Sequence, residues 1–208
     1  MESNWASEHL QVIRTLMERS AIYRRALAPI MTVAGIVGLA AAVIPCVVEI
    51  RTTRLFSLFW MGVSVVAAVA AFLLVRRQAL KEAEPFWSLP TRRVTHALAP
   101  AFLIGLACGV FTAFAPGQAL FTSTLLAIVW ITAYGCALHA AAFFMPRGMR
   151  LLGGIFVVSG IVLLGGYAYC PWLLKPESAH YLMGIFFGVL HLAYGIYLYF
   201  TEKQKQAA

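Results

Sequence analysis

Aspartate is absent from this 208-residue sequence, and its eight acidic residues are all glutamates. Charged residues of both signs make up 12% of the chain, about half the share found in a typical soluble domain. Seven glutamates lie well outside the long apolar stretches, and Glu49 lies at the outer end of the first stretch. Two-carboxylate hydrolysis, metal-assisted hydrolysis and carboxylate-coupled ion transport therefore lack the acidic groups that they need.

Motifs for nucleophilic or cofactor chemistry are also missing. No serine or cysteine stands in a motif that would place a base beside it. His96 and His180 fall at the predicted membrane surfaces, while His139 and His191 lie about 28 Å and about 15 Å from the outer ends of their own helices. The two ligands of a membrane haem should lie at the same depth in the bilayer, and these two histidines do not. We therefore expect no enzymatic activity, no metal and no other cofactor.

What the sequence has in excess is apolar residues, which make up 62% of the chain and give it a mean hydropathy of +0.82. About 20 apolar residues suffice for a helix to cross the hydrocarbon of a bilayer. The runs do not alternate between polar and apolar residues as the strands of a membrane barrel would. The sequence therefore predicts an all-α, polytopic membrane protein with six transmembrane helices. Their expected ranges are 27–48, 55–75, 97–114, 119–145, 151–170 and 181–200.

The basic residues indicate the orientation of these helices. With the N-terminus inside, thirteen of the sixteen lysines and arginines fall on the cytoplasmic side, and only Arg51, Arg54 and Lys175 fall outside. Such a bias is typical of cytoplasmic loops. We therefore expect a multi-pass protein of the cell's inner membrane, with both termini in the cytoplasm (N-in/C-in). The net charge of +8 then reflects topology and attraction to anionic lipid, and we expect no nucleic-acid partner.

The sequence divides into three segments. Residues 1–26 read as an amphipathic helix, because Trp5, Val12, Ile13, Leu16 and Tyr23 recur at helical spacing. This helix fits two roles, lying in the lipid interface or docking a cytoplasmic protein partner through residues 5–25. Residues 27–200 form the predicted transmembrane bundle, and residues 201–208 a short cytoplasmic tail. The sequence does not decide whether the chain forms a homo-oligomer.

The last apolar stretch places a histidine, His191, among glycines. Gly184, Gly188 and Gly195 share one face of an ideal helix with it, and small residues let membrane helices approach closely. We therefore expect helix packing through these glycines and a histidine that points into the bundle. A buried imidazole needs a polar partner. Side chains of suitable type on other predicted helices are Tyr134, which we favour, Thr112 and Ser159. His191 is then either an interhelical hydrogen-bonding group or part of a ligand, proton or gating site.

The four cysteines allow at most one disulfide between the ends of spans. Cys108 and Cys136 fall within predicted spans, where thiols act as small apolar residues. Cys46 and Cys170 both fall at outer ends of spans, where a disulfide could form. The geometry that a disulfide needs does not follow from sequence. We favour free thiols at both positions.

Several short motifs follow one another in a recognisable order. The first is an Ile-Arg-x-x-Met-Glu-Arg-Ser helix, beginning at Ile13, and the second is Ala-Gly-Ile-x-x-Leu, beginning at Ala34. A Trp-x-x-x-Tyr-Gly element covers Trp130, Tyr134 and Gly135, and Gly-x-x-His-x-x-x-Gly covers Gly188, His191 and Gly195. In this order the chain resembles a family of small six-helix bacterial membrane proteins over most of its length. Relatives carry Leu-Pro-Gly before a tryptophan, where this chain has residues 115–118 as Ala-Pro-Gly-Gln.

The resemblance implies six helices and a bacterial membrane, but no activity. Two functions therefore stay open. The first is a non-enzymatic sensing or scaffolding module with a cytoplasmic partner, which the lack of intramembrane carboxylates favours. The second is a passive channel or carrier for a small neutral or apolar solute, with His191 and Tyr134 lining its path.

Overall fold

The computed structural model describes residues 26–81, 83, 86–87, 89–115, 121–145 and 147–207. Within these ranges the chain is helical and contains no strand. Six helices are long and apolar enough to cross a membrane, which confirms the predicted all-α fold and the number of long apolar helices. The predicted amphipathic helix at residues 1–26 lies almost wholly outside the described residues. The six apolar helices are Ala26–Cys46, Thr53–Lys81, Thr91–Phe114, Ser123–Phe144, Gly148–Gly166 and Pro176–Thr201.

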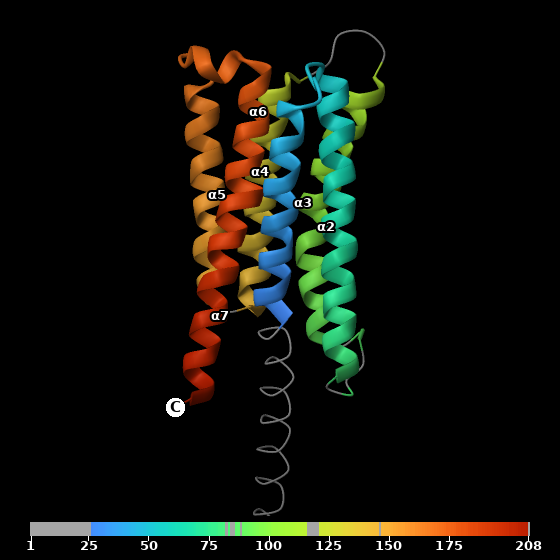
Figure 1. Cartoon of the computed structure of the whole chain (residues 1–208), viewed down its shortest axis with the longest axis vertical. Coiled ribbons are helices and arrows are strands. Elements are labelled where there is room, and N and C mark those ends of the chain that lie inside the picture. Colours follow the sequence, from blue (N-terminus) through green and yellow to red (C-terminus); the bar gives the residue numbers. More distant parts are fainter. Residues whose placement is uncertain are drawn as a thin grey trace, which may run out of the picture.

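Successive long helices run up and down the bundle (Figure 1). The first span, Ala26–Cys46, ends in the short 3-10 turn η1 (Ile44–Cys46). It is followed by α2 (Thr53–Lys81), α3 (Leu89–Phe114) and α4 (Ser123–Ala141), which the turn η2 (Ala142–Phe144) extends. The remaining elements are α5 (Arg147–Gly166), η3 (Pro171–Leu174), α6 (Pro176–Met183), the π-helix η4 (Gly184–Leu190) and α7 (His191–Ala207).

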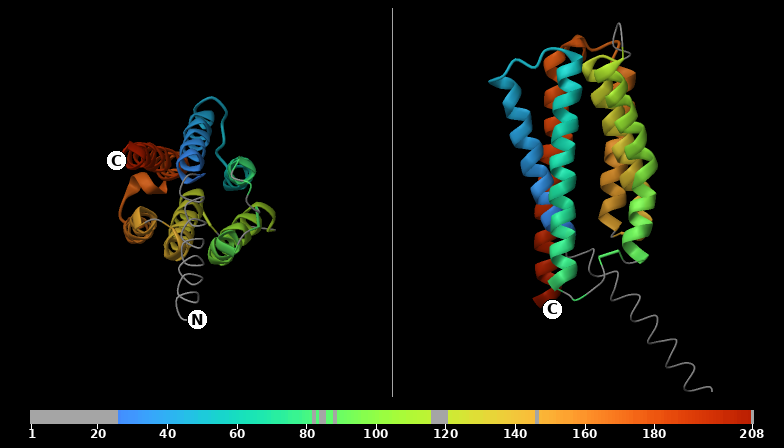
Figure 2. Two further views of the ribbon diagram at one scale, coloured as in Figure 1. Left: turned by 90° about the horizontal axis from the view of Figure 1, so that it is seen from below. Right: turned by 90° about the vertical axis from the view of Figure 1, so that its right-hand side faces the viewer.

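The last span, Pro176–Thr201, comprises α6, η4 and most of α7. Seen along the bundle, it lies beside the first span, and α4 lies between α3 and α5 (Figure 2). Half of the apolar window of α4 and of the last span is buried, compared with 6% for α2. These two helices therefore form the centre of the bundle, and α2 forms its edge.

Local sequence signals account for several helix ends. Thr122 precedes α4, and its hydroxyl accepts a hydrogen bond from the backbone N–H of Leu125 at 3.2 Å. Such a capping bond satisfies one of the N–H groups that the first turn leaves unpaired. Pro171 and Pro176 begin η3 and α6, at positions where a proline removes no needed donor.

Several helix ends differ from the predicted ranges, two of them near charged residues. The helix α3 begins at Leu89, eight residues before the predicted start at residue 97, and so includes Arg92 and Arg93. The helix α7 continues through Ala207, so the predicted tail at residues 201–208 is helical over 201–207. Charge-free runs underestimate helix length, because the backbone hydrogen bonds of a helix continue past the end of its apolar segment.

Glycines bring the first and last spans into close contact. A Cβ built on Gly35 would lie 2.5 Å from the backbone nitrogen of Leu192, and one built on Gly38 would lie 2.5 Å from the carbonyl oxygen of Phe187. From the other side, a Cβ on Gly195 would lie 2.6 Å from the backbone nitrogen of Thr32. Only glycine allows backbones to approach this closely. We call this contact the glycine seam.

The core consists of two clusters. The larger joins the first span, α4, α5 and the last span, and includes Ile131, Phe156 and Phe186. The smaller lies where α2 meets α4 and α6, and includes Phe56 and Trp60. Each cluster surrounds one histidine of the last span.

Candidate functional site

His191 is the first residue after the π-helix and is almost completely buried, with 2% of its surface exposed. Its Nε2 lies 2.7 Å from the hydroxyl oxygen of Tyr134 on α4. Its Nδ1 lies 2.9 Å from the carbonyl oxygen of Phe186, five residues earlier in the same span. The structure thus brings together the two residues that the sequence proposed as a polar pair.

These contacts define the protonation of the ring. A carbonyl oxygen can only accept, so Nδ1–H donates to Phe186. In the neutral ring Nε2 then carries a lone pair and accepts a hydrogen bond from the Tyr134 hydroxyl. A charged imidazole at this depth would need a compensating anion, and the glutamates whose side chains are described, Glu49 and Glu177, both lie at one end of the bundle, away from the depth of His191. We therefore assign the neutral Nδ1–H tautomer.

Aromatic rings enclose the histidine on its remaining sides. Phe156 on α5 meets it edge-on, with ring centroids 5.6 Å apart, and Phe187 stacks on it at 5.8 Å. Tyr134 also contacts both phenylalanines, at 5.3 Å and 5.1 Å. The polar pair is therefore sealed within a hydrophobic cluster, and neither ring nitrogen is free to bind a solute. We call the pair the inner node.

The helix α4 positions Tyr134 by contacts to three neighbouring helices. The indole Nε1–H of Trp130 donates to the carbonyl of Gly105 on α3 at 2.8 Å. Gly135 lies against α5, where an added Cβ would meet the side chain of Phe156 at 2.7 Å. Tyr134 reaches the last span. The Trp-x-x-x-Tyr-Gly element thus joins α4 to α3, α5 and the last span at the centre of the bundle.

The last span differs from the ideal helix assumed in the sequence analysis. The glycine face meets the first span, where Gly188 lies against Leu39, whereas His191 faces α4 and α5. The prediction of one shared face is therefore wrong. The physical reason is the π-helix over Gly184–Leu190, whose wider turns shift the angular position of later residues.

A second polar pair was missed. His180 lies near the start of the last span and is 5% exposed. Its Nδ1 accepts a hydrogen bond from the indole Nε1–H of Trp60 on α2 at 3.1 Å, so its Nε2–H donates to the carbonyl of Ile50 at 3.3 Å. We call this pair the outer node. A histidine at the edge of an apolar stretch gave no sign of burial, and nothing in the sequence links it to Trp60.

The other predicted partners of His191 have different neighbours. Thr112 donates to the carbonyl of Cys108 on its own helix at 2.7 Å, and Ser159 lines a groove on the outer surface. His139 lines the same groove and is exposed. All four cysteines are free thiols, so Cys46 and Cys170 form no disulfide.

The described part of the chain brings together no group of three His, Cys, Asp or Glu side chains with the geometry of a metal site. Comparisons with known proteins give no further guidance, since no family model, curated protein or solved structure matches this chain.

Proposed function

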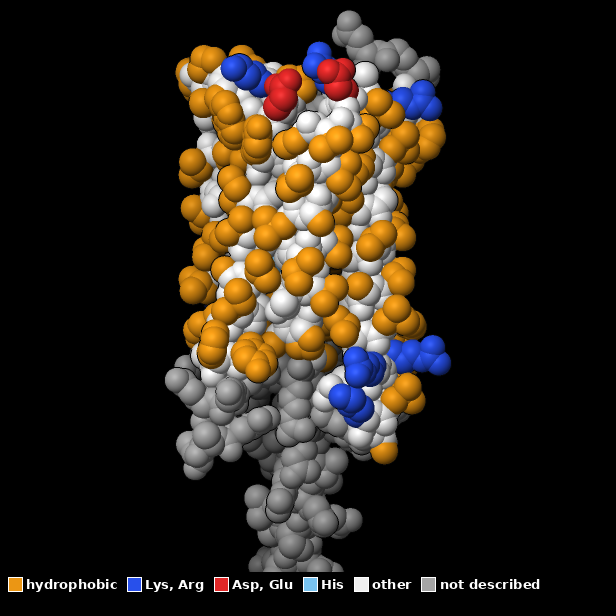
Figure 3. Space-filling model, in the orientation of Figure 1, with side chains coloured by type: hydrophobic (Ala, Val, Ile, Leu, Met, Phe, Trp, Pro, Cys, Tyr) orange, Lys and Arg blue, Asp and Glu red, His pale blue; other side chains and the backbone are white. Residues whose placement is uncertain are grey.

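We propose that the protein spans a bacterial inner membrane six times, with both termini in the cytoplasm. Large apolar side chains are exposed around the bundle, as at Leu103 (64%), Phe111 (65%) and Val162 (66%). Soluble monomers rarely expose apolar surface on this scale. Figure 3 shows these side chains as a broad band, with charged side chains at the two ends. A bilayer would cover this band and leave the charges in water.

The distribution of charge supports the orientation. One end of the bundle carries Arg76, Arg77 and Lys81 of α2, Arg92 and Arg93 of α3, and Arg150 of α5. The opposite end carries only Arg51, Arg54 and Lys175 among the described lysines and arginines, and Arg51 pairs with Glu49 at 2.7 Å. Lysine and arginine gather on the cytoplasmic side of membrane proteins. The end with these basic clusters is therefore proposed to face the cytoplasm.

Within that membrane we propose a non-enzymatic sensing or scaffolding role. The observation that carries this proposal is the closed inner node, because both nitrogens of His191 are bonded to protein atoms and aromatic rings surround it. A path for a neutral solute would need polar groups that face water, as pore linings do. A sealed node instead holds three helices in one arrangement, which suits a protein that presents surfaces to partners.

The proposed cytoplasmic partner would dock through residues 5–25. This idea rests on the amphipathic pattern of that segment, which lies outside the described residues. The basic end of the bundle adjoins it in sequence through the first span, which begins at Ala26. A partner bound there would sit beside the end that carries the positive charges.

Labelling with a membrane-impermeant maleimide tests the orientation. Cys46 is an exposed free thiol at the end proposed to face outward. In spheroplasts we expect it to react, whereas an Arg77→Cys residue introduced into a cysteine-free chain should react only after the membrane is opened. The reverse pattern would overturn the proposed topology.

Reconstitution tests the scaffolding role against solute passage. Liposomes that contain the full chain should shrink in glycerol or urea at the rate of protein-free liposomes. A faster rate that His191→Phe abolishes, in a variant with an unchanged fold, would favour the channel reading. In parallel, deletion of residues 1–22 should abolish co-purification of a partner but leave membrane insertion intact, whereas deletion of residues 202–208 serves as the control. Interactors that persist in the first deletion would rule out docking through this segment.

A further inference from the structure

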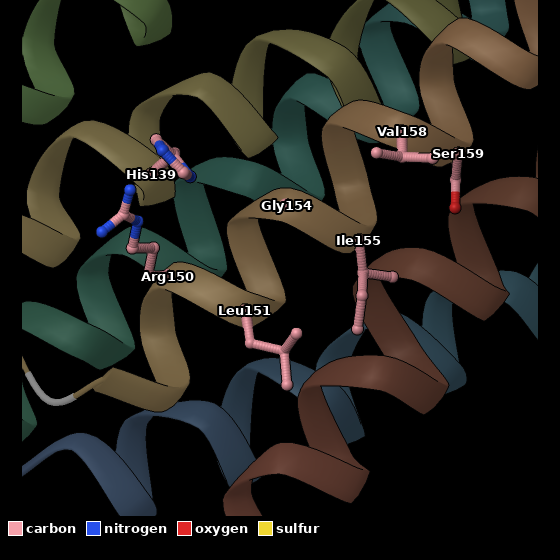
Figure 4. A pocket seen from close by; sticks show the side chains of 7 residues that line it. All are labelled: His139, Arg150, Leu151, Gly154, Ile155, Val158 and Ser159. Carbon is pink, nitrogen blue, oxygen red and sulfur yellow. The ribbon is translucent and has the colours of Figure 1, made fainter.

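A groove lies on the outer surface between α4 and α5, with a volume of about 670 Å³ (Figure 4). At one end it is lined by two groups that can donate hydrogen bonds, the imidazole of His139 and the guanidinium of Arg150. From there it follows α5 along Leu151, Ile155 and Val158. The groove therefore has a polar end and a long apolar part.

Two consecutive glycines shape this groove. Gly153 faces α4, and a Cβ there would lie 2.7 Å from the backbone nitrogen of His139, so the two helices touch closely. Gly154 faces the other way, and a Cβ there would meet nothing within 4 Å. Gly153 thus draws the helices together, and the missing side chain of Gly154 leaves the groove open.

The polar end carries positive charge that no carboxylate among the described side chains neutralises. Arg150 is exposed, and no described carboxylate pairs with it. The glutamates with described side chains, Glu49 and Glu177, belong to the opposite end of the bundle. A guanidinium binds phosphate through two parallel N–H donors, and an imidazole N–H adds a third. The groove end therefore suits a phosphate group.

The apolar part has the length of one acyl chain in one leaflet. Leu151, Gly154, Ile155 and Val158 recur at helical spacing and form one stripe. From Arg150 to Ser159 the groove runs about 13 Å along the helix axis, because each residue rises about 1.5 Å. Half of a bilayer's hydrocarbon thickness is about 15 Å. The side chains of Leu151 and Val158 are 69% and 61% exposed and so are open to such a chain.

We propose that the α4–α5 groove binds one anionic phospholipid from the leaflet at the basic end of the bundle. Its phosphate contacts Arg150 and His139, and one acyl chain lies over Gly154 between Leu151 and Val158. Basic pockets between membrane helices bind the headgroups of anionic lipids in this manner. The assignment rests on the proposed membrane location but not on a scaffolding role, and lipid binding is measured separately from partner capture or solute flux.

Native mass spectrometry of the full chain, titrated in detergent with dioleoylphosphatidylglycerol or dioleoylphosphatidylcholine, tests the site. We expect one phosphatidylglycerol to bind about tenfold more tightly than phosphatidylcholine, because both lipids offer a phosphate but the choline cation of phosphatidylcholine is repelled by Arg150. Arg150→Gln should abolish this preference. Gly154→Leu, whose Cβ would have no other atom within 4 Å, should fill the groove and lower the occupancy of both lipids, and Gly154→Ala should lower it less.

Two matched variants serve as controls. Arg77→Gln removes the same charge at the same end of the bundle, and Gly62→Leu adds the same side chain at a glycine that also has open space. Both should bind lipid as the wild type does. Equal losses in Arg150→Gln and Arg77→Gln would reduce the effect to general attraction and overturn the site. Unchanged lipid occupancy in Gly154→Leu would overturn it too, and a wild-type dimer that this variant splits would assign the groove to a second copy of the chain.

Helicity by circular dichroism and a single peak in size exclusion establish that each variant is folded. Gly154 faces open space, so the Ala and Leu variants keep the test decisive even where Arg150→Gln fails to fold.

Discussion

His191 and His180 lie on the same span, and each is a buried histidine with both ring nitrogens in hydrogen bonds. The inner node takes its carbonyl from the histidine's own helix, at Phe186, and its hydroxyl from Tyr134 on α4. The outer node takes both partners from elsewhere, the indole of Trp60 on α2 and the carbonyl of Ile50 in the connection before α2.

This difference separates two kinds of buried polar pair. One bond of the inner node lies within the last span, between the His191 ring and the Phe186 carbonyl, so only the other bond needs α4. The outer node forms only when α2 docks. Since only 6% of the apolar window of α2 is buried, Phe56, Ser57 and Trp60 at its start provide much of its attachment. We infer that the inner node defines the bundle and that the outer node attaches its edge.

The largest expected effect comes from overpacking the glycine seam. Gly35→Leu would drive a side chain into the backbone of Leu192, the residue after His191, where even a Cβ has only 2.5 Å. Overpacking against a side chain costs about 1–3 kcal/mol, and rigid backbone should cost more. We expect no monodisperse protein, or a melting temperature lower by more than about 10 °C in detergent. Gly62→Leu, at an exposed glycine on α2, should melt as the wild type does. Equal melting of the two variants would contradict the glycine seam.

A smaller effect should follow from breaking the inner node alone. His191→Phe keeps an aromatic ring but leaves the buried Tyr134 hydroxyl without its hydrogen-bond partner, and such an orphan costs about 1–3 kcal/mol. We expect a clear loss of thermal stability in detergent. A double-mutant cycle with Tyr134→Phe should give a coupling of about 1 kcal/mol, because the two side chains are in direct contact. Additive losses would show that the pair does not act as a unit.

Breaking the outer node should cost less and act locally. Trp60→Phe removes the indole donor to His180 and retains much of the apolar contact, so we expect a loss of about 1 kcal/mol. Hydrogen exchange should rise in residues 49–57, which join the first span to α2. His191→Phe should leave exchange in that segment unchanged, since it lies in the other cluster. The same exchange pattern in both variants would mean that the two nodes are not separate.

The smallest expected effect is the difference in tautomer between the two histidines, which is measured on the wild-type protein. In ¹⁵N-histidine-labelled protein, the nitrogen chemical shifts should assign His191 to the Nδ1–H tautomer and His180 to the Nε2–H tautomer. The reason is that each carbonyl acceptor selects the nitrogen that carries the proton. Two signals of the same tautomer would contradict the assigned direction of the hydrogen bonds in one of the nodes. The variants His180→Gln and His191→Gln identify the signals.

Sequence reasoning found different parts of this arrangement with different success. The six apolar helices follow from their composition, because any charge-free run of sufficient length favours a helix in a bilayer. Tyr134 was named as a partner of His191 by side-chain type, together with Thr112 and Ser159, and only the packing of α4 against the last span selects it. Trp60 and His180 stand 120 positions apart, and no spacing relates them.

The π-helix shows a second limit of prediction from sequence spacing. Spacings of three and four residues place Gly184, Gly188 and His191 on one face only if every turn holds 3.6 residues. A wider turn over Gly184–Leu190 breaks that rule and lets the glycines face the first span while His191 faces α4. The residues of this stretch do not predict a π-helix, since glycine and aliphatic residues fit either kind of helix.

The residues of the chain are enough to dictate long apolar helices, small-residue surfaces on them and positive charge at one end, because each of these is a property of a short segment read alone. Which helices become neighbours is decided by packing between segments that all look alike to lipid. That packing chose Tyr134 and Trp60 as partners, oriented the two imidazoles and opened the groove over Gly154. Hydrogen-bond geometry depends on positions in three dimensions, and hydropathy carries no information about them.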